Sequence, residues 1–232
     1  TVVLKGQQKL YPGVNYFWVS VEMNPNTSLT STLSATVEGA KADGQMLPVK
    51  TVSAPMKRYM GIGVRHAGDD GSNAFRIPGL VTTNKGTLLG VYDVRYNNSN
   101  DLQEHVDIGL SRSTDGGKTW EKMRLPLSFG ETGDMPKAQN GVGDPSILVD
   151  TKTNTIWIVA AWTHGMGNQR AWVSSHPGMD MYHTAQLVMA KSTDDGKTWS
   201  APINITDQVK NPEWHFLLQG PGRGITMQDG TL

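Results

Sequence analysis

The sequence predicts an all-β fold built from repeated units. An octapeptide occurs twice, as Ser-Thr-Asp-Gly-Gly-Lys-Thr-Trp at residues 113–120 (box 1) and as Ser-Thr-Asp-Asp-Gly-Lys-Thr-Trp at residues 192–199 (box 2). Short runs of β-branched and aromatic residues recur between turn residues, and no stretch has a 3.6-residue apolar period with helix caps. Seven identical positions out of eight indicate repeated structural units.

The composition is that of a globular protein. The 232 residues are 37% hydrophobic and 18% charged, and 26 Gly and 12 Pro favour turns over long helices. Lys and Arg balance Asp and Glu at 21 each, so the charge gives no reason to expect nucleic acid as a partner. The absence of Cys excludes disulfides and thiolate metal sites, and no apolar run is long enough to span a membrane.

Residues 1–55 are predicted to be the later part of a β-sandwich domain. The run from Val14 to Met23 is rich in aromatic and β-branched residues, and residues 30–37 and 46–52 have the pattern of two further strands. Fifty-five residues are too few to form two packed sheets alone. A carbohydrate-binding module and a plain spacer are both open readings of this domain.

Residues 56–232 are predicted to form the repeated part, with a boundary near Ser53. Strands are expected, in chain order, at residues 75–80, 86–94, 105–112, 145–149, 155–162 and 186–191. Two of them, 105–112 and 186–191, run directly into box 1 and box 2. Residues 145–149 and 155–162 form a hairpin around the turn 150–154.

Each box has the chemistry of a hairpin turn that is fixed by its own side chains. The Asp accepts backbone N–H bonds, the Gly supplies unusual backbone angles, and the Thr-Trp pair begins a strand. The motif resembles the Asp-box of β-propeller proteins, among which the sialidases (neuraminidases) are best known. The resemblance implies the first half of a six-bladed propeller, about three blades. Because Asp115 and Asp194 lie 79 residues apart, about one blade is expected between the boxes.

Phe75-Arg76-Ile77-Pro78, followed by the boxes, resembles the pattern of the sialidase family. An Arg between apolar residues on a strand is expected to be largely buried, and a plain salt bridge is the alternative reading. The resemblance implies that Arg76 is the first of three arginines that bind the substrate carboxylate. A planar guanidinium matches a carboxylate with two hydrogen bonds and stays charged.

The next segment, residues 92–101, adds to the resemblance. In the family a second Arg and then a loop Asp follow at about this distance, which implies that Arg95 contacts the 4-hydroxyl side of the sugar and that Asp101 is the general acid/base. The composition of the Asn-Asn-Ser-Asn-Asp loop also fits a plain turn. Asp93 is a rival carboxylate, but it lies inside a predicted strand. As an acid near neutral pH, Asp101 needs desolvation by the substrate.

Three further residues are candidates by the same resemblance. Asp144, in Gly-Asp-Pro-Ser, is implied to pair with the second Arg near the 4-hydroxyl. Trp162 and Met166 are implied to line an apolar pocket for the N-acetyl group, although packing is the alternative reading for both. The Gly-Pro-Gly stretch at residues 220–222 resembles one at the pocket edge of bacterial sialidases, and no role is assigned to its neighbours Gln219 and Arg223.

The function implied is an exo-α-sialidase that releases terminal sialic acid from glycoconjugates with retention. The family's Tyr nucleophile, its Glu and two more arginines are expected beyond residue 232, so the remainder of the polypeptide is the expected partner, together with sialylated glycans. The six His residues show no ligand spacing, and no metal or cofactor is expected. A secreted, periplasmic or surface location is expected. A non-enzymatic glycan-binding or protein-binding propeller and a trans-sialidase remain the alternatives.

Overall fold

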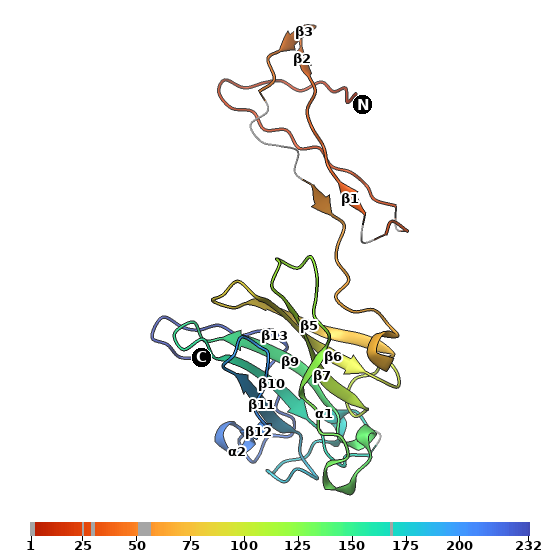
Figure 1. Cartoon of the computed structure of the whole chain (residues 1–232), viewed down its shortest axis with the longest axis vertical. Helices are drawn as coiled ribbons and strands as arrows, with labels where there is room; N and C mark the ends of the chain where they lie inside the picture. The colour runs from red at the N-terminus through yellow and green to blue at the C-terminus, as the bar shows by residue number, and fades with distance from the viewer. Residues whose placement is uncertain (1–2, 25, 29–30, 51–56, 168) are drawn as a thin grey trace. The chain divides into compact units, whose positions relative to one another are not determined.

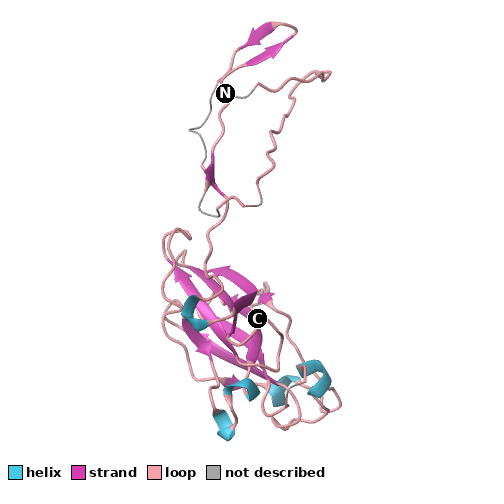
Figure 2. Cartoon of the chain, turned by 90° about the vertical axis from the view of Figure 1, so that its right-hand side faces the viewer, coloured by secondary structure: helices cyan, strands magenta, loops and turns pink. Residues whose placement is uncertain are grey.

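The structure is a computed structural model that describes residues 3–24, 26–28, 31–50, 57–167 and 169–232. The chain divides into two compact units, Thr1–Gly61 and Ile62–Leu232. The predicted boundary at residues 55 and 56 falls outside the described residues. Almost all regular structure is β, with only short helical turns between the strands (Figure 2). The prediction of an all-β fold is therefore confirmed.

The described residues of the first unit form two small antiparallel pairs. Strand β1 (Thr32–Leu33) pairs with β4 (Arg58–Tyr59), and β2 (Ala40–Ala42) pairs with β3 (Gln45–Leu47). Asp43 and Gly44 join β2 to β3, and both have positive φ, at 49° and 81°, as a two-residue hairpin turn of type I′ requires. The sandwich assignment of this unit stays a prediction.

The prediction of a strand over residues 14–23 is wrong. These residues lie outside any strand, and Tyr16, Phe17 and Trp18 are exposed. Strand composition does not form a strand by itself, because the backbone N–H and C=O groups need a partner strand to bond with.

In the second unit, the described residues form two neighbouring sheets whose main strands are antiparallel (Figure 1). The first has the order β5 (Ala74–Thr82), β6 (Leu88–Arg95), β7 (Val106–Ser113) and β8 (Arg124–Leu127). The second consists of β9 (Val142–Val149), β10 (Ile156–Trp162), β11 (Gln186–Ser192) and β12 (Ile203–Asn204), with β13 (Gly222–Arg223) added in parallel beside β9. Each main sheet is an up-and-down meander, as in one propeller blade.

The helical elements are short and lie in the connections. Helix α1 spans Ala171–Ser174 and α2 spans Thr206–Val209, while the 3-10 turns η1 (Asp69–Gly71), η2 (Thr132–Asp134) and η3 (Lys137–Gln139) complete the described set. Four residues make about one helical turn, too short to be stable without the surrounding packing. The absence of a helical period in the sequence agrees with these lengths.

The two boxes lie in successive sheets, so the prediction of a blade between them was wrong. Box 1 connects β7 to β8, and box 2 connects β11 to β12. Their wide spacing comes from two long connections, 128–141 and 163–185, that leave the ends of β8 and β10. The structure thus describes two blade-like sheets and the strand β13, and the count of about three blades stays a prediction.

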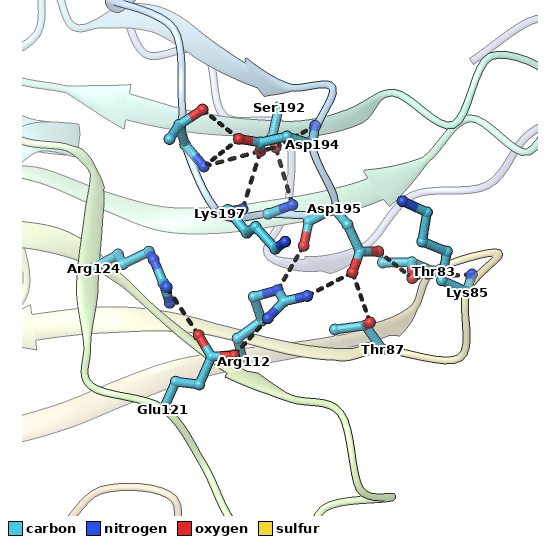
Figure 3. A network of polar contacts seen from close by, with 12 residues as sticks. Thr83, Lys85, Thr87, Arg112, Glu121, Arg124, Ser192, Asp194, Asp195 and Lys197 are labelled. Carbon is cyan, nitrogen blue, oxygen red and sulfur yellow. Dashed lines mark hydrogen bonds and ion pairs between the residues drawn. The ribbon is translucent and has the colours of Figure 1, made fainter.

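The core of the second unit lies between the two sheets. It is formed by alternate apolar residues from the facing strands, among them Leu89, Val91, Ile108, Leu110, Ile147, Ile156, Ile158 and Val188. A polar network also joins the sheets. Asp195 of box 2 bonds Arg112 of β7, and it bonds Thr83 and Thr87 in the connection between β5 and β6 (Figure 3). Burial and these bonds hold the sheets in one arrangement.

A repeated feature occurs within β5 and β9 and just before β13. In each, a residue with left-handed backbone precedes Pro: Ile77 (φ 55°), Asp144 (φ 58°) and Gly220 (φ 75°). The parallel register of Gly222 with Ser146 places Gly220 opposite Asp144. The strands approach closely, since a Cβ on Gly79 would lie 2.4 Å from the carbonyl oxygen of Gly222. Two of the predicted site positions lie at these left-handed residues: Arg76 directly precedes Ile77, and Asp144 is itself left-handed.

Candidate active site

Four of the six predicted site residues gather at one end of the two sheets. Arg76 lies on β5 and is opposite Asp93 of β6, while Arg95 follows Asp93 by two residues on the same strand. Residues at this spacing, and residues opposite one another, share one face of a sheet. The register therefore puts both arginines and Asp93 on one face.

Asp101 joins this group through two ion pairs. Its Oδ1 accepts hydrogen bonds from Arg95 Nη1 at 2.7 Å and from Arg76 Nη1 at 3.1 Å. The same two nitrogens also donate to the carbonyl oxygen of Ser99, at 2.9 and 2.8 Å. The loop between β6 and β7 is thus bonded to both arginines.

The burial of the two arginines differs from the prediction. Arg76 was expected to be largely buried, but 43% of its side chain is exposed, whereas the Arg95 side chain is 2% exposed. The left-handed residue Ile77 forms a bulge in β5 between Arg76 and Gly79, and the bulge interrupts the pairing with β6. Arg76 is therefore open to a ligand, and Arg95 is the buried cation that requires a partner.

That partner is Asp93, whose side chain is 1% exposed. Its Oδ2 accepts from Arg95 Nη2 at 2.7 Å and from Arg95 Nε at 3.1 Å, and its Oδ1 accepts from the backbone N–H of Asp144 at 2.9 Å. Burial raises the pKa of Asp93 to about 7, and the hydrogen bond and charge of Arg95 oppose this rise. Asp93 is thus a buried bridge between the Arg95 guanidinium and the backbone of Asp144.

Asp144 is half-buried and lies in the second sheet. Burial raises its pKa, the charge of Arg95 opposes the rise, and the charge of Asp101 adds to it. The side chain is thus within electrostatic reach of the cluster, and its pairing with Arg95 stays a prediction. Its left-handed backbone, rare outside Gly, is bonded on both sides: Asp93 accepts from its N–H, and Gln219 Nε2 donates to its carbonyl oxygen.

Asp101 is held in its ionised form. Burial acts to raise its pKa, but the hydrogen bond from Arg95 and the charges of Arg95 and Arg76 bring the pKa below its usual value. The charge of Arg170 adds to this effect, and Arg170 Nη1 also donates to the Asp101 carbonyl oxygen at 2.7 Å. A proton can reside on Asp101 near neutral pH only if a ligand draws the arginines away.

Trp162 makes the contacts of a packing residue. Trp162 is 5% exposed, belongs to the core, and stacks on Phe129 with ring centroids 4.2 Å apart. Its other ring neighbour is His164, at 5.2 Å. Met166 is 8% exposed. The structure places both residues at and beyond the end of β10, and their role in an N-acetyl pocket stays a prediction.

Three contributors to the site had no role assigned from the sequence. Gln219 holds the backbone of Asp144, and Arg170 holds that of Asp101. Glu104 accepts from Asn97 and Asn98 at 2.7 and 2.8 Å and so fixes the loop before Asp101. The spacing of Asp93 and Arg95, two residues apart on one strand, was a signal in the sequence for the buried pair. The contacts of Gln219 and Arg170 join segments that are distant in sequence, so the sequence holds no local signal for them.

The described residues, 3–24, 26–28, 31–50, 57–167 and 169–232, offer neither a metal cluster nor a membrane helix. In that part of the chain, His, Asp and Glu side chains form no cluster of three or more that could hold a metal ion. None of its helices has the length and apolarity needed to cross a membrane. The candidate site is thus a set of two arginines and three carboxylates.

Comparisons with known proteins agree with this architecture. The family model described as a BNR repeat-like domain matches residues 77–232, and the model described as the N-terminal domain of BNR-repeat neuraminidase matches residues 1–46. The chain is 76% identical to a sialidase of Bacteroides fragilis over all 232 residues, which are 43% of that protein. It is 33% identical to a sialidase of Micromonospora viridifaciens over 201 residues, 85% of this chain and 29% of that protein.

Solved structures give the same result. The Hadza microbial sialidase Hz136 superposes with a TM-score of 0.75 at 62% identity, covering 89% of this chain and 40% of that one. The leech intramolecular trans-sialidase superposes with a TM-score of 0.58 at 20% identity, over 74% of this chain and 41% of that one, which supports the fold alone. The chain thus spans less than half the length of these relatives. With its two boxes, its blade-like sheets and these matches, the chain belongs to the BNR-repeat neuraminidase (sialidase) family.

Proposed function

We propose that this chain is the N-terminal portion of an exo-α-sialidase that hydrolyses terminal sialic acid from glycoconjugates with retention. The observation that carries the proposal is the cluster of Arg76, Arg95 and Asp101, in which an exposed guanidinium and a loop carboxylate are bonded to one another. The high identity to a protein named a sialidase supports it.

Arg76 would bind the substrate carboxylate. Its guanidinium is open, and its present partner is itself a carboxylate, so the site already has the geometry to receive one. When the substrate carboxylate takes the place of Asp101 beside Arg76, Asp101 loses a cation and water is excluded. Both changes raise the pKa of Asp101 and favour its protonated form.

Asp101 would then protonate the leaving oxygen and later activate water. Arg95 and Asp144 would bind the 4-hydroxyl side of the sugar. The Tyr nucleophile, its Glu and two further arginines would come from the rest of the polypeptide, which makes that remainder the partner of this chain. A secreted, periplasmic or surface location is proposed with this function, because glycoconjugates of this class are displayed outside cells.

The test is the release of 4-methylumbelliferone from its α-sialoside by the full-length protein and three variants. Asp101→Ala is expected to lower kcat roughly 100-fold or more, since general acid catalysis contributes about 10²–10⁴. Arg76→Ala is expected to raise KM, because the carboxylate loses a charged double hydrogen bond. Arg124→Ala on the outer strand β8 is the control and should leave both constants near the wild-type values.

Either of two results would count against the proposal. One is the absence of turnover in the folded, full-length wild-type protein, which would favour a glycan-binding propeller. The other is full activity in Asp101→Ala with the fold intact by circular dichroism.

A further inference from the structure

We propose that Asp93 is a buried positioning residue. It fixes the orientations of Arg95 and Asp144 and so determines how these two residues recognise the sugar. The proposal rests on the proposed function of the site and assigns a role to a residue that does not touch substrate. It is carried by one geometric fact: a single buried carboxylate bonds two proposed substrate-contacting residues that come from different sheets.

Asp93 fixes the orientation of the Arg95 guanidinium. Its Nε and Nη2 both donate to Asp93 Oδ2, at 3.1 and 2.7 Å, which leaves Nη1 as the atom directed to Asp101. Because the guanidinium is planar, fixing two of its nitrogens fixes the direction of the third. Asp93 therefore determines where the Arg95 guanidinium faces the ligand side.

Asp93 also fixes the backbone of Asp144. A non-glycine residue at φ 58° is sparsely populated and persists only where its surroundings hold it. Asp93 Oδ1 accepts from the Asp144 N–H at 2.9 Å, and Gln219 bonds the carbonyl oxygen of the same residue. The two bonds fix the backbone on both sides of Cα, and so fix the direction in which the Asp144 carboxylate leaves the bulge.

Both oxygens of Asp93 are needed at once, so Asn cannot replace it. An Asn side chain has one acceptor oxygen and one NH₂ group. Whichever way it is turned, its NH₂ faces a donor, either the Arg95 guanidinium or the Asp144 N–H. Asp93→Asn thus preserves size and removes one of the two connections.

A matched control is available on the neighbouring strand. Asp107 on β7 is also buried, at 6% exposure, and its pKa is likewise raised by burial. Its hydrogen bonds are with Ser128 and Tyr96, and not with Arg95 or Asp144. Asp107→Asn therefore reproduces the loss of a buried charge in the same sheet without touching the two proposed contacts.

The experiment compares two substrates in the full-length protein: the 4-methylumbelliferyl α-sialoside and its 4-deoxy analogue. For wild type, removal of the 4-hydroxyl should lower kcat/KM roughly 10- to 100-fold, the range for a lost hydrogen bond to a charged group. In Asp93→Asn this penalty should fall below about threefold, because Arg95 and Asp144 no longer converge on the hydroxyl. In Asp107→Asn the penalty should equal that of wild type.

The substrate comparison separates positioning from general damage, because a merely destabilised enzyme loses activity on both substrates equally. If Asp93→Asn does not fold, Asp93→Glu, which keeps the charge but moves it by one methylene, is measured instead with the same readout. A folded Asp93 variant that keeps the full wild-type penalty overturns the inference, as does a wild type with no penalty. Absence of any turnover by wild type overturns the proposed function as well.

Discussion

At the scale of single residues, the site is defined by carboxylates that bond the same arginines. Asp101 is bonded to Arg76 and Arg95 in the free protein, and these contacts hold its pKa below the usual value against the effect of burial. A general acid that is ionised when the site is empty must gain its proton as the substrate binds. The cations around Asp101 thus control the pH range over which the proposed enzyme works.

Arg170 offers a way to test this control without removing a proposed substrate contact. Its charge lowers the pKa of Asp101, so Arg170→Gln should raise that pKa. Since kcat/KM reports the pKa of the free enzyme and a general acid acts while protonated, the alkaline limb of the pH profile of kcat/KM should move to higher pH.

The measurement is the pH dependence of kcat/KM on the 4-methylumbelliferyl sialoside for the full-length protein. Arg65→Gln is the control, because Arg65 bonds Asp70 and the carbonyl oxygen of Glu121 and its removal leaves the surroundings of Asp101 unchanged. An alkaline limb that stays in place, or moves to lower pH, would contradict the role given to Arg170.

At the scale of elements, the two boxes are turns that their own side chains close. In box 2, Asp194 accepts from the backbone N–H and the hydroxyl of Thr198, at 2.9 and 2.6 Å, and from Ser192 Oγ at 2.8 Å. Box 1 repeats this pattern with Asp115, Thr119 and Ser113. Partial burial acts to raise the pKa of Asp194, but these hydrogen bonds lower it to about 2.

Asp194→Ala should destabilise the propeller by about 1–2 kcal/mol, since it removes several hydrogen bonds to a charged group at a partly exposed turn. The folded-state pKa is depressed, so the ionised Asp194 contributes stability above its unfolded pKa, near 3.8, and loses it as pH falls through about 2. The difference between wild type and variant should therefore be full at pH 7 and shrink below about pH 4.

Thermal unfolding of the full-length protein at pH 7 and at pH 3 measures this difference. Asp207→Ala, which removes an exposed carboxylate from α2, is the control and should change the melting temperature little at either pH. A difference between Asp194→Ala and wild type that grows on acidification would refute the assignment.

Local sequence chemistry was sufficient where the interactions are local. The boxes, the hairpin turn at Asp150 and the strand that carries Arg95 all follow from residues within a few positions of one another. Arg76 and Asp101 were found by resemblance, and the structure brings them together. Strand composition failed over residues 14–23, because whether such a run forms a strand depends on a partner that its own residues do not name.

At the scale of the whole molecule, the relation between the sheets could not be predicted, because it depends on contacts between distant residues. Asp195 bonds Thr83, Thr87 and Arg112, which lie 112, 108 and 83 positions away in the chain. Asp93 and Asp144, which join the two sheets at the candidate site, are 51 positions apart. The sequence does contain a signal for the network around Asp195. The two boxes differ at a single position, which is Asp195 in box 2 and Gly116 in box 1.

That difference has a structural consequence, which the network in Figure 3 makes plain. Asp195 Oδ2 lies 2.6 Å from Arg112 Nη2, and the two side chains are 8% and 6% exposed. Arg112 Nε also donates to the Asp195 carbonyl oxygen at 2.7 Å. Box 1 places Gly116 at the equivalent turn position, with open space around the place of a Cβ. Box 2 is thus a turn and also the link that attaches the second sheet to the first.

Exchanging the residues at this one position tests the link. Asp195→Gly should lower the stability of the propeller by about 2–4 kcal/mol, because removal of one partner leaves the buried Arg112 with Glu121 alone as an ion-pair partner among the described residues. The loss is reduced by about 1 kcal/mol because the left-handed backbone of Asp195, φ 67°, suits Gly better. Gly116→Asp, the matched control at φ 73°, should cost only about 1 kcal/mol for its backbone. Thermal and urea unfolding of the full-length protein measure both, and equal effects of the two substitutions would show that the sheets are held together without Asp195.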